Sequence, residues 1–251
     1  MSVTKLFLAA LALLGTACPL LGQETEPEPQ RLPVGHIACS SGLLKWFTTA
    51  TVVDDRRTIL AAGHFDTISH GGRLIQGKAS RCEFRLYDVA GVVSFRSKLA
   101  IIQRGGGPFE RTLSRATDWS LLELERQVPA ETKPLALKFD HVAPKRKKIA
   151  IHGFVIPGRG DRRSIVSCDA WPASAGSIVL RYNCLTAPGW SGAPLISRKD
   201  GQAFVLGVHS GRWKAYGEGV GLNLGLAERM SHLIDRNSAG AFRPRTTRRS
   251  D

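Results

Sequence analysis

The sequence predicts an all-β protein made of many short strands, arranged as a sandwich or a barrel. Short apolar runs rich in β-branched residues alternate with turns of Asp, Gly and Arg along most of the chain. The 26 Gly residues suit such turns, and the sequence lacks the repeats of about 20–50 residues that mark solenoids and propellers. With 43% hydrophobic and 22% charged residues among 251, the composition is globular, and no apolar run reaches the ~20 residues of a membrane-spanning helix.

The N-terminal residues have the order of an export signal. Lys5 precedes the apolar run 6–14, which is followed by the small residues 15–17. The run is too short to span a bilayer, so we expect 1–22 to be a signal peptide with its cleavage region. Residues 23–35 are rich in Glu, Gln and Pro and are expected to form a flexible mature N-terminus. The protein is therefore predicted to be exported, to the periplasm or the medium.

Export favours disulfides among the five Cys residues. Without Cys18, which leaves with the signal or alternatively carries a lipid anchor, an even number remains, and three pairings are possible. Cys168 and Cys184 lie at the ends of two strand-like segments joined by a turn-prone stretch, which favours a bridge between them. Four free thiols are the alternative. A zinc site is disfavoured because the sequence has no C-x-x-C motif and no close Cys and His cluster.

The strand-like segments fall into two groups, separated by a Pro-bearing stretch at 129–148. We therefore expect a first domain at 36–130 and a second at 131–236. The clearest strand-like segments are 47–53, 58–62, 82–89, 98–103, 149–155, 165–170, 178–184 and 203–209.

One helix is expected near the C-terminus. Leu226, Met230, Leu233 and Ile234 follow the spacing of a helix face, and this face would pack on the second domain. The last residues, 237–251, are polar and basic and are predicted to be disordered.

Three segments each place one reactive side chain in an apolar or Gly-rich context. His64 follows T-I-L-A-A-G, Asp118 opens D-W-S-L-L-E-L, and Ser191 lies in the turn G-W-S-G. A Ser hydroxyl is a poor nucleophile until a base such as His removes its proton. A buried carboxylate fixes the tautomer of that His and stabilises the imidazolium. The segments predict a catalytic triad of His64, Asp118 and Ser191, whereas Asp66 is expected to be a loop carboxylate.

In this order the segments A-A-G-H, T-D-W-S-L-L-E-L and G-W-S-G-A-P resemble the three motifs of the chymotrypsin-like serine proteases. The resemblance covers 36–235 and implies two six-stranded antiparallel β-barrels with the site between them. His64 and Asp118 would come from the first barrel and Ser191 from the second. The backbone N–H groups of Gly189 and Ser191 would form the oxyanion hole. An α/β-hydrolase is disfavoured, because that class has G-x-S-x-G and the order Ser, Asp, His.

Two positions depart from the animal digestive members of that family. Trp190 replaces the Asp that pairs with a newly cut N-terminal amine, so we expect no such activation switch. Phe65 replaces the Cys that follows the catalytic His, so the usual bridge there is missing. Cys39 and Cys82 are candidates for a different bridge in the first barrel.

A closer resemblance is to bacterial glutamyl endopeptidase-like members, which share T-x-x-G-x-S-G-x-P and a later G-[VI]-H stretch. In that branch the equivalents of Thr186 and His209 help to bind an acidic P1 side chain, and Ser210 and Gly211 would complete the pocket. A hydroxyl and an imidazole can both bond a carboxylate. Because the same stretch is a plain pocket wall in other members, a small or mixed P1 preference remains the alternative.

The net charge of +14, from 35 Lys and Arg against 21 Asp and Glu, raises a rival function. A field of one sign attracts acidic polymers, so the chain could be an inactive protease-fold module that binds acidic partners. The motif of alternating aromatic and basic residues typical of RNA or single-strand binders is missing, and no nucleic acid is expected. We predict a serine-type endopeptidase with protein or peptide substrates, no cofactor and no metal ion. A monomer is taken as the default, since the sequence does not address the oligomeric state.

Overall fold

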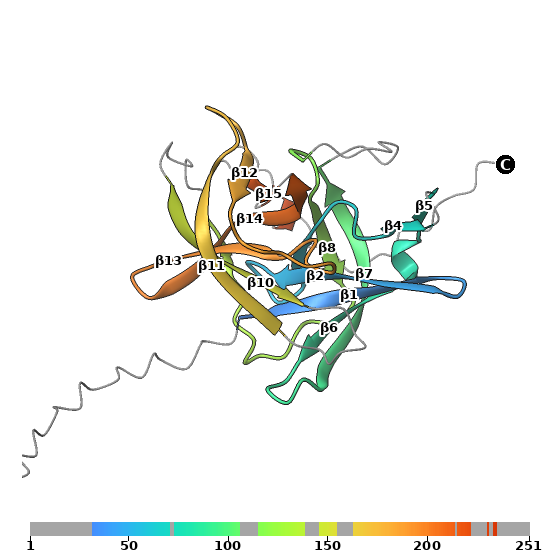
Figure 1. Ribbon diagram of the computed structural model, residues 1–251. Helices are drawn as coiled ribbons and strands as arrows, with labels where there is room; N and C mark the ends of the chain where they lie inside the picture. The colour runs from blue at the N-terminus through green and yellow to red at the C-terminus, as the bar shows by residue number, and fades with distance from the viewer. Residues whose placement is uncertain are drawn as a thin grey trace, which may run out of the picture. The chain divides into compact units, whose positions relative to one another are not determined.

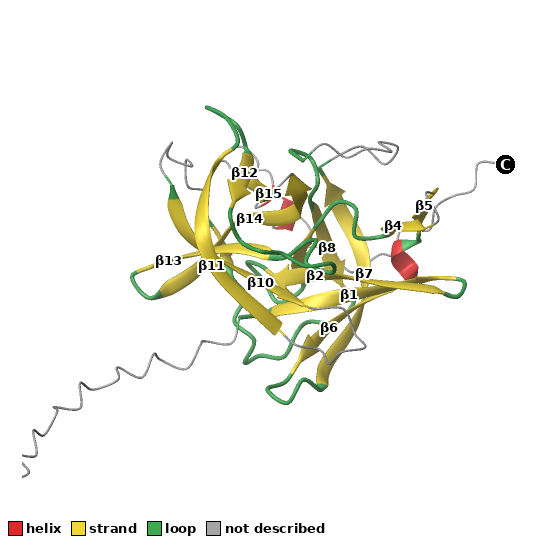
Figure 2. Cartoon of the chain, in the orientation of Figure 1, coloured by secondary structure: helices red, strands yellow, loops and turns green. Residues whose placement is uncertain are grey.

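Strands supply almost all of the regular structure in the described part of this protein (Figures 1 and 2). The structure is a computed structural model, and it describes residues 32–70, 73–105, 115–138, 146–154, 163–213, 215–221, 230 and 233–234. The predicted signal peptide and the basic tail lie outside the described residues. The all-β prediction is confirmed, and the architecture is two closed antiparallel barrels of six strands each.

The first barrel closes in the order β1-β2-β3-β8-β7-β6. Its strands are β1 (Val34–Ser41), β2 (Leu44–Val52), β3 (Thr58–Ala61), β6 (Cys82–Tyr87), β7 (Val93–Arg104) and β8 (Ser120–Leu124). β1 pairs antiparallel with both β2 and β6, which closes the ring. Between β3 and β6 lie the hairpin of β4 (Thr67–His70) and β5 (Arg73–Gln76) and the short 3₁₀ helix η1 (Ala79–Arg81). β1 begins at Val34 and Leu32 is buried, so the described fold starts earlier than the predicted boundary at 36.

The second barrel closes in the order β13-β10-β11-β12-β15-β14, with β14 pairing back to β13. Its strands are β10 (Lys147–Phe154), β11 (Arg163–Pro172), β12 (Val179–Tyr182), β13 (Pro194–Lys199), β14 (Gln202–Trp213) and β15 (Tyr216–Gly221). The two-residue strand β9 (Ala136–Leu137) adds in parallel to β14. It lies within the Pro-bearing stretch at which the sequence predicted a domain boundary.

Alternating burial explains why these segments form barrel walls. Along β10, Ile149 and Ile151 are buried, whereas Ala150 and His152 between them are half-buried. This period of two places one row of side chains in the barrel interior. Two of the three hydrophobic cores fill the barrels, and the third packs side chains of both barrels together, among them Leu121 from β8 and Val208 from β14.

The predicted C-terminal helix lies largely outside the described residues. Met230, Leu233 and Ile234 have helical backbone, and Met230 and Ile234 are buried in the core that both barrels share. Their burial agrees with the predicted packing face, and the helix as a whole remains a prediction.

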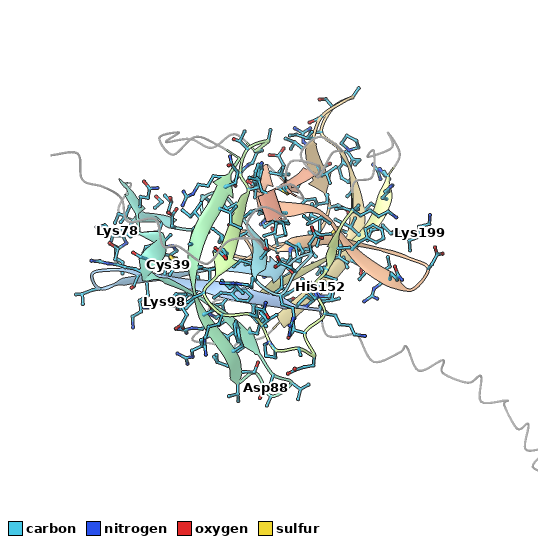
Figure 3. All side chains as sticks on the ribbon, turned by 180° about the vertical axis from the view of Figure 1, so that it is seen from behind. Cys39, Lys78, Asp88, Lys98, His152 and Lys199 are labelled. Carbon is cyan, nitrogen blue, oxygen red and sulfur yellow. A yellow bond between two sulfur atoms is a disulfide. The ribbon has the colours of Figure 1, made fainter. Side chains whose placement is uncertain are left out.

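Both candidate disulfides are present. Cys39 joins Cys82 between the paired strands β1 and β6, and Cys168 on β11 joins Cys184, which lies just after β12. Figure 3 labels Cys39 on the first barrel. It also shows Lys78 and Lys98 on that barrel and Lys199 on the other, all three exposed, so these charges are spread over both barrels.

Removing the bridges one at a time should give unequal losses of stability. The Cys39–Cys82 bridge spans 43 residues and the Cys168–Cys184 bridge 16. Because the longer loop loses more entropy on closure, the paired Cys→Ser variants should lose about 4 and about 3 kcal/mol of unfolding free energy respectively. Urea unfolding of both variants and the oxidised parent measures this. Equal losses, or a larger loss for the shorter loop, would contradict the entropic account.

A buried imidazole in the first barrel makes stability depend on pH. His36 is 1% exposed, packs against Phe47 and Phe154, and has its Nε2 2.8 Å from the Tyr87 hydroxyl. Burial, aided by the charge of Arg85, lowers the pKa of His36 from 6.5 to about 4. The native state therefore keeps this side chain neutral at pH values where the unfolded chain protonates it.

As the pH falls from 6.5 towards 4, His36 becomes protonated in the unfolded state but stays neutral in the native state. The free energy of unfolding therefore falls. His36 should contribute about 3 kcal/mol to that loss. Urea unfolding at intervals across this range should show a smaller pH dependence in His36→Gln. The matched control is His70→Gln, at an exposed His, which should keep the full dependence. An unchanged slope in His36→Gln would show that other groups cause the acid sensitivity.

Candidate active site

His64 lies in the loop that follows β3, directly after the buried residues Ala62 and Gly63. Its ring Nδ1 is 2.8 Å from Oδ2 and 2.9 Å from Oδ1 of Asp118, and its backbone N–H donates to Oδ1 at 3.0 Å. One carboxylate thus holds both the main chain and the ring of His64. The His64 side chain is 34% exposed, whereas that of Asp118 is 2% exposed. One edge of the imidazole is therefore fixed while the ring remains accessible.

Asp118 lies two positions before the buried strand β8, and Trp119 between them packs into the shared core. Besides His64, its carboxylate accepts a short hydrogen bond from the Ser210 hydroxyl of β14. Burial alone would raise the pKa of Asp118. The hydrogen bond and charge of His64 and the bond from Ser210 outweigh burial and lower it. Asp118 therefore stays ionised and can stabilise a positive charge on His64.

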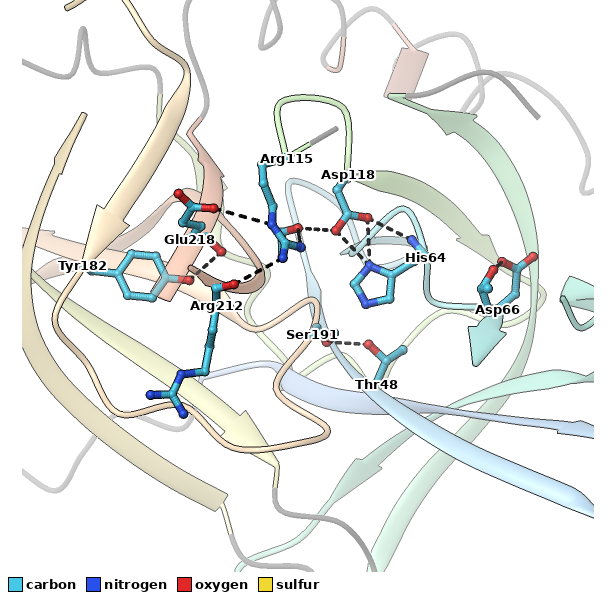
Figure 4. A network of polar contacts seen from close by, with 11 residues as sticks. Thr48, His64, Asp66, Arg115, Asp118, Tyr182, Ser191, Arg212 and Glu218 are labelled. Atoms are coloured by element: carbon cyan, nitrogen blue, oxygen red, sulfur yellow. Dashed lines mark hydrogen bonds and ion pairs between the residues drawn. The ribbon is translucent and has the colours of Figure 1, made fainter. Parts of the chain in front are cut away.

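Ser191 lies in a turn between β12 and β13 that is docked on the first barrel (Figure 4). Its carbonyl oxygen accepts from the Thr48 hydroxyl and, at 2.8 Å, from the backbone N–H of Thr49. Gly192 has a positive φ of 82°, and a Cβ there would lie 2.1 Å from the Thr49 carbonyl oxygen and 2.9 Å from the Ala62 nitrogen. Only Gly fits this close approach. The contact brings the Ser191 turn beside the loop that carries His64.

The backbone N–H groups around Ser191 differ in their partners. Trp190 donates to the Ala187 carbonyl, Gly192 to that of His209, and Ala193 to that of Trp190, at 2.7–3.1 Å. For the N–H groups of Gly189 and Ser191, the described part of the chain offers no acceptor. Gly189 has a φ of 91°, which favours Gly, and its carbonyl accepts from Thr49 Oγ1 at 2.8 Å. Two donors beside the Ser191 side chain are thus left without an acceptor among the described residues.

The predicted pocket residues lie near this site on two segments. His209, Ser210 and Gly211 are consecutive on β14, and the His209 N–H donates to the Ala193 carbonyl at 2.8 Å. Thr186 is half-buried in the segment before the Ser191 turn. Among the described residues, no hydrogen bond of its side chain is found.

His209 is 3% exposed and bonds through Nδ1 with the Tyr182 hydroxyl. Burial, with the nearby charges of His64 and Arg115, lowers the pKa of His209 to about 3. The imidazole is therefore neutral at neutral pH and acts through its hydrogen bonds.

Sequence comparisons give no match, either to a protein-family model or to a curated protein. Solved structures do match. A thermostable serine protease from an extremophilic microorganism has a TM-score of 0.57, with 15% identity, over 82% of this chain and 97% of the other. A Glu endopeptidase in complex with MPD has a TM-score of 0.54, with 13% identity, over 82% and 90%. This chain has the chymotrypsin-like fold. At these identities the likeness is one of fold, and it confirms the predicted architecture of two six-stranded barrels.

Trp190 and Phe65, the two positions that differ from the animal digestive members, are both buried beside the site. Trp190 is 2% exposed and packs so closely on Gly153 that any side chain there would clash with the indole. Phe65 is fully buried, and Asp66 pairs with Arg104, whose guanidinium lies 5.0 Å above the Phe65 ring. The Asp66–Arg104 ion pair thus lies next to Phe65, the position at which the animal digestive members have a disulfide-bonded Cys. Asp66 is a loop carboxylate, as predicted.

Three residues of the polar network were missed from the sequence: Arg115, Tyr182 and Glu218. Two of them contact groups that the sequence did single out, since Arg115 bonds Ser210 and Tyr182 bonds His209. Glu218 is 5% exposed and pairs with Arg115 and Arg181. One signal was present, because a lone acidic residue in the small and apolar stretch Y-G-E-G-V-G is a buried charge that needs a partner.

Neither a metal centre nor a membrane helix is found in the parts of the chain that the structure describes. No three His, Cys, Asp or Glu residues there are grouped so that they could hold a metal ion. No helix there has the length and apolar character needed to cross a bilayer.

Proposed function

We propose that this chain is an exported serine endopeptidase that uses Ser191, His64 and Asp118. The observation that carries the proposal is the Asp118–His64 pair facing a Ser turn docked on the same barrel. His64 Nδ1 lies 2.8 Å from the buried carboxylate, which leaves Nε2 as the proton acceptor. Two disulfides suit an oxidising compartment outside the cytosol.

In the proposed mechanism, the Ser191 hydroxyl attacks the scissile carbonyl carbon while His64 Nε2 accepts its proton. Asp118 accepts the hydrogen bond from Nδ1–H and stabilises the imidazolium. The oxyanion accepts hydrogen bonds from the N–H groups of Gly189 and Ser191, the two donors without an acceptor in the described chain. His64 then protonates the leaving amine, an acyl-enzyme forms on Ser191, and water attacks it with His64 again as the base.

Casein hydrolysis by the purified oxidised protein tests this proposal, together with labelling by a serine-directed phosphonylating reagent. We expect cleavage and a single label on Ser191, located by mass spectrometry. An unlabelled protein that does not cleave casein but binds acidic polymers would instead support the rival reading, an inactive binding module. The net charge of +14 is the observation that favours this second candidate function, because a positive surface attracts acidic polymers.

Selectivity for an acidic P1 residue is the finer part of the proposal. Thr186 is half-buried in the segment before the Ser191 turn, and His209 is a neutral buried imidazole. The pocket would therefore bond a carboxylate through the Thr186 hydroxyl and, in the tautomer with the proton on Nε2, through the His209 N–H. A site built to hydrogen-bond a substrate group discriminates more strongly than an apolar pocket does.

Peptides that differ only at P1 should show a kcat/KM for Glu about tenfold above that for Gln. In Thr186→Val, which keeps the side-chain shape but removes the hydroxyl, this ratio should fall. Added salt should leave the ratio unchanged, because a pocket effect is local, whereas attraction by the basic surface weakens with salt at every subsite. Equal rates for Glu, Gln and Ala would indicate the alternative, a small or mixed preference, and would leave the triad proposal intact.

A further inference from the structure

Arg115 connects the Asp118 turn to the second barrel (Figure 4). It lies three positions before Asp118, and its guanidinium reaches across to β14 and β15. Nη1 donates to the Ser210 hydroxyl at 2.9 Å, and Nη2 donates to the Arg212 carbonyl at 3.5 Å. Nε lies 3.6 Å from Oε2 of Glu218.

These contacts fix the direction of the Ser210 hydroxyl. A hydroxyl has one proton to donate and two lone pairs that accept, whereas a guanidinium only donates. Because Arg115 donates to Ser210 Oγ, the Ser210 proton is committed to Asp118, which accepts it. A hydroxyl polarised by a cation is also a stronger donor. Arg115 thus supports the carboxylate without touching it.

The surroundings hold this guanidinium in place. Glu218 is buried and also pairs with Arg181 at 3.1 Å, so the carboxylate is fixed between two Arg side chains. The guanidinium lies directly over Gly211, where a Cβ would come within 2.6 Å of Nη1. Any larger residue at 211 would displace Arg115, so the Gly is part of the arrangement.

The geometry points to Arg115 as a positioning residue for the Asp118–His64 pair, acting through the Ser210 hydroxyl and held there by Glu218. The inference rests on the proposed function, and it adds a cation to the electrostatics of the site. Only the Ser210 hydroxyl stands between this guanidinium and the Asp118 carboxylate. The other titratable groups that face this pair are His209 and Tyr182 in the second barrel and Glu218 on β15.

Arg115→Met should lower kcat about tenfold to a hundredfold, the size expected for a lost charge-assisted hydrogen bond, with KM little changed. Arg115→Lys keeps the charge without the fork geometry, so kcat should recover only in part. The matched control is Arg212→Met, which removes an exposed cation whose side chain takes no part in these contacts. It should leave kcat and KM unchanged.

A double-mutant cycle with Ser210→Ala separates positioning from a merely structural role. If Arg115 acts through Ser210, Arg115→Met should cost little more once the hydroxyl is gone. Additive losses would overturn the inference. So would a rise in KM confined to acidic peptides, because Arg115 would then be binding substrate. Thermal unfolding of each variant identifies losses that come from misfolding.

The low-field proton resonance of His64 Nδ1–H gives a readout that does not require hydrolysis. In Arg115→Met and in Ser210→Ala this resonance should shift in the same direction, because the acceptor carboxylate loses the same support. It should stay in place in Arg212→Met. If the parent protein cleaves nothing and the resonance still responds in this way, the proposed function fails and the positioning role stands. An unmoved resonance in Arg115→Met overturns the positioning role whatever the activity.

Discussion

Replacing Ser191 with Ala is expected to lower kcat/KM by about 10⁴-fold or more and to leave the fold intact. The loss follows from removing the nucleophile, since no other hydroxyl is proposed to form the acyl-enzyme. The fold should survive because the Ser191 carbonyl, and not its hydroxyl, anchors the turn to Thr48 and Thr49. Rates with a peptide substrate and the urea midpoint measure both effects.

The matched control for this change is Ser197→Ala, at a half-buried Ser on β13 outside the proposed site. This variant also loses one Ser hydroxyl, but it should keep the full kcat/KM. Activity that persists in Ser191→Ala at the parental level would exclude Ser191 as the nucleophile. A collapse of the urea midpoint would mean that the hydroxyl itself holds the turn.

The second large effect is expected for Asp118→Asn, which should lower kcat about 10⁴-fold. Asp118 Oδ1 and Oδ2 both lie within 2.9 Å of His64 Nδ1, so either oxygen can accept the hydrogen bond from Nδ1–H. An amide can present its NH₂ group to Nδ1 instead, and the tautomer with the proton on Nε2 cannot take the Ser191 proton. Measuring kcat from pH 5 to pH 9 would show whether the loss persists throughout.

Asp66→Asn is the control, because it is the same change at a second buried carboxylate two positions after His64. Asp66 pairs with Arg104 and not with His64, so activity should fall by less than tenfold. Stability should suffer more, because breaking one partner of a buried ion pair costs about 3–5 kcal/mol. If Asp66→Asn were inactive and Asp118→Asn active, Asp66 and not Asp118 would be the carboxylate that orients His64.

Much of the fold was accessible from the sequence because its signals are local. The alternation of buried and half-buried positions in segments such as 147–154 follows the period of a strand, whatever it pairs with. The bridge between Cys168 and Cys184 was predictable for the same reason, since the two Cys residues flank one hairpin. Closure into two separate rings was not a local property. It came from the family resemblance, and the pairings of β1 with β6 and of β14 with β13 confirm it.

The polar network shows what the sequence did not contain. Ser210 lies at an irregularity in the pairing of β14 with β15, where His209 faces Gly219 and Gly211 faces Glu218. This leaves Ser210 as the extra residue of a bulge, and bulges redirect side chains. Its hydroxyl therefore reaches Asp118, 92 positions earlier in the chain. No pattern around either residue encodes that register.

By itself, the sequence determined which reactive groups are present and the local context of each: His64 after a strand, Asp118 before one, and Ser191 in a Gly turn. Those contexts depend on neighbours in the chain, and short-range backbone preferences can be read from residue types. The tertiary structure alone decided which groups meet. Arg115 reaches Ser210, and Glu218 lies between Arg115 and Arg181, because strand register and packing between barrels bring together segments that are far apart in the chain. Such contacts depend on the positions of whole strands, so no single stretch of sequence specifies them.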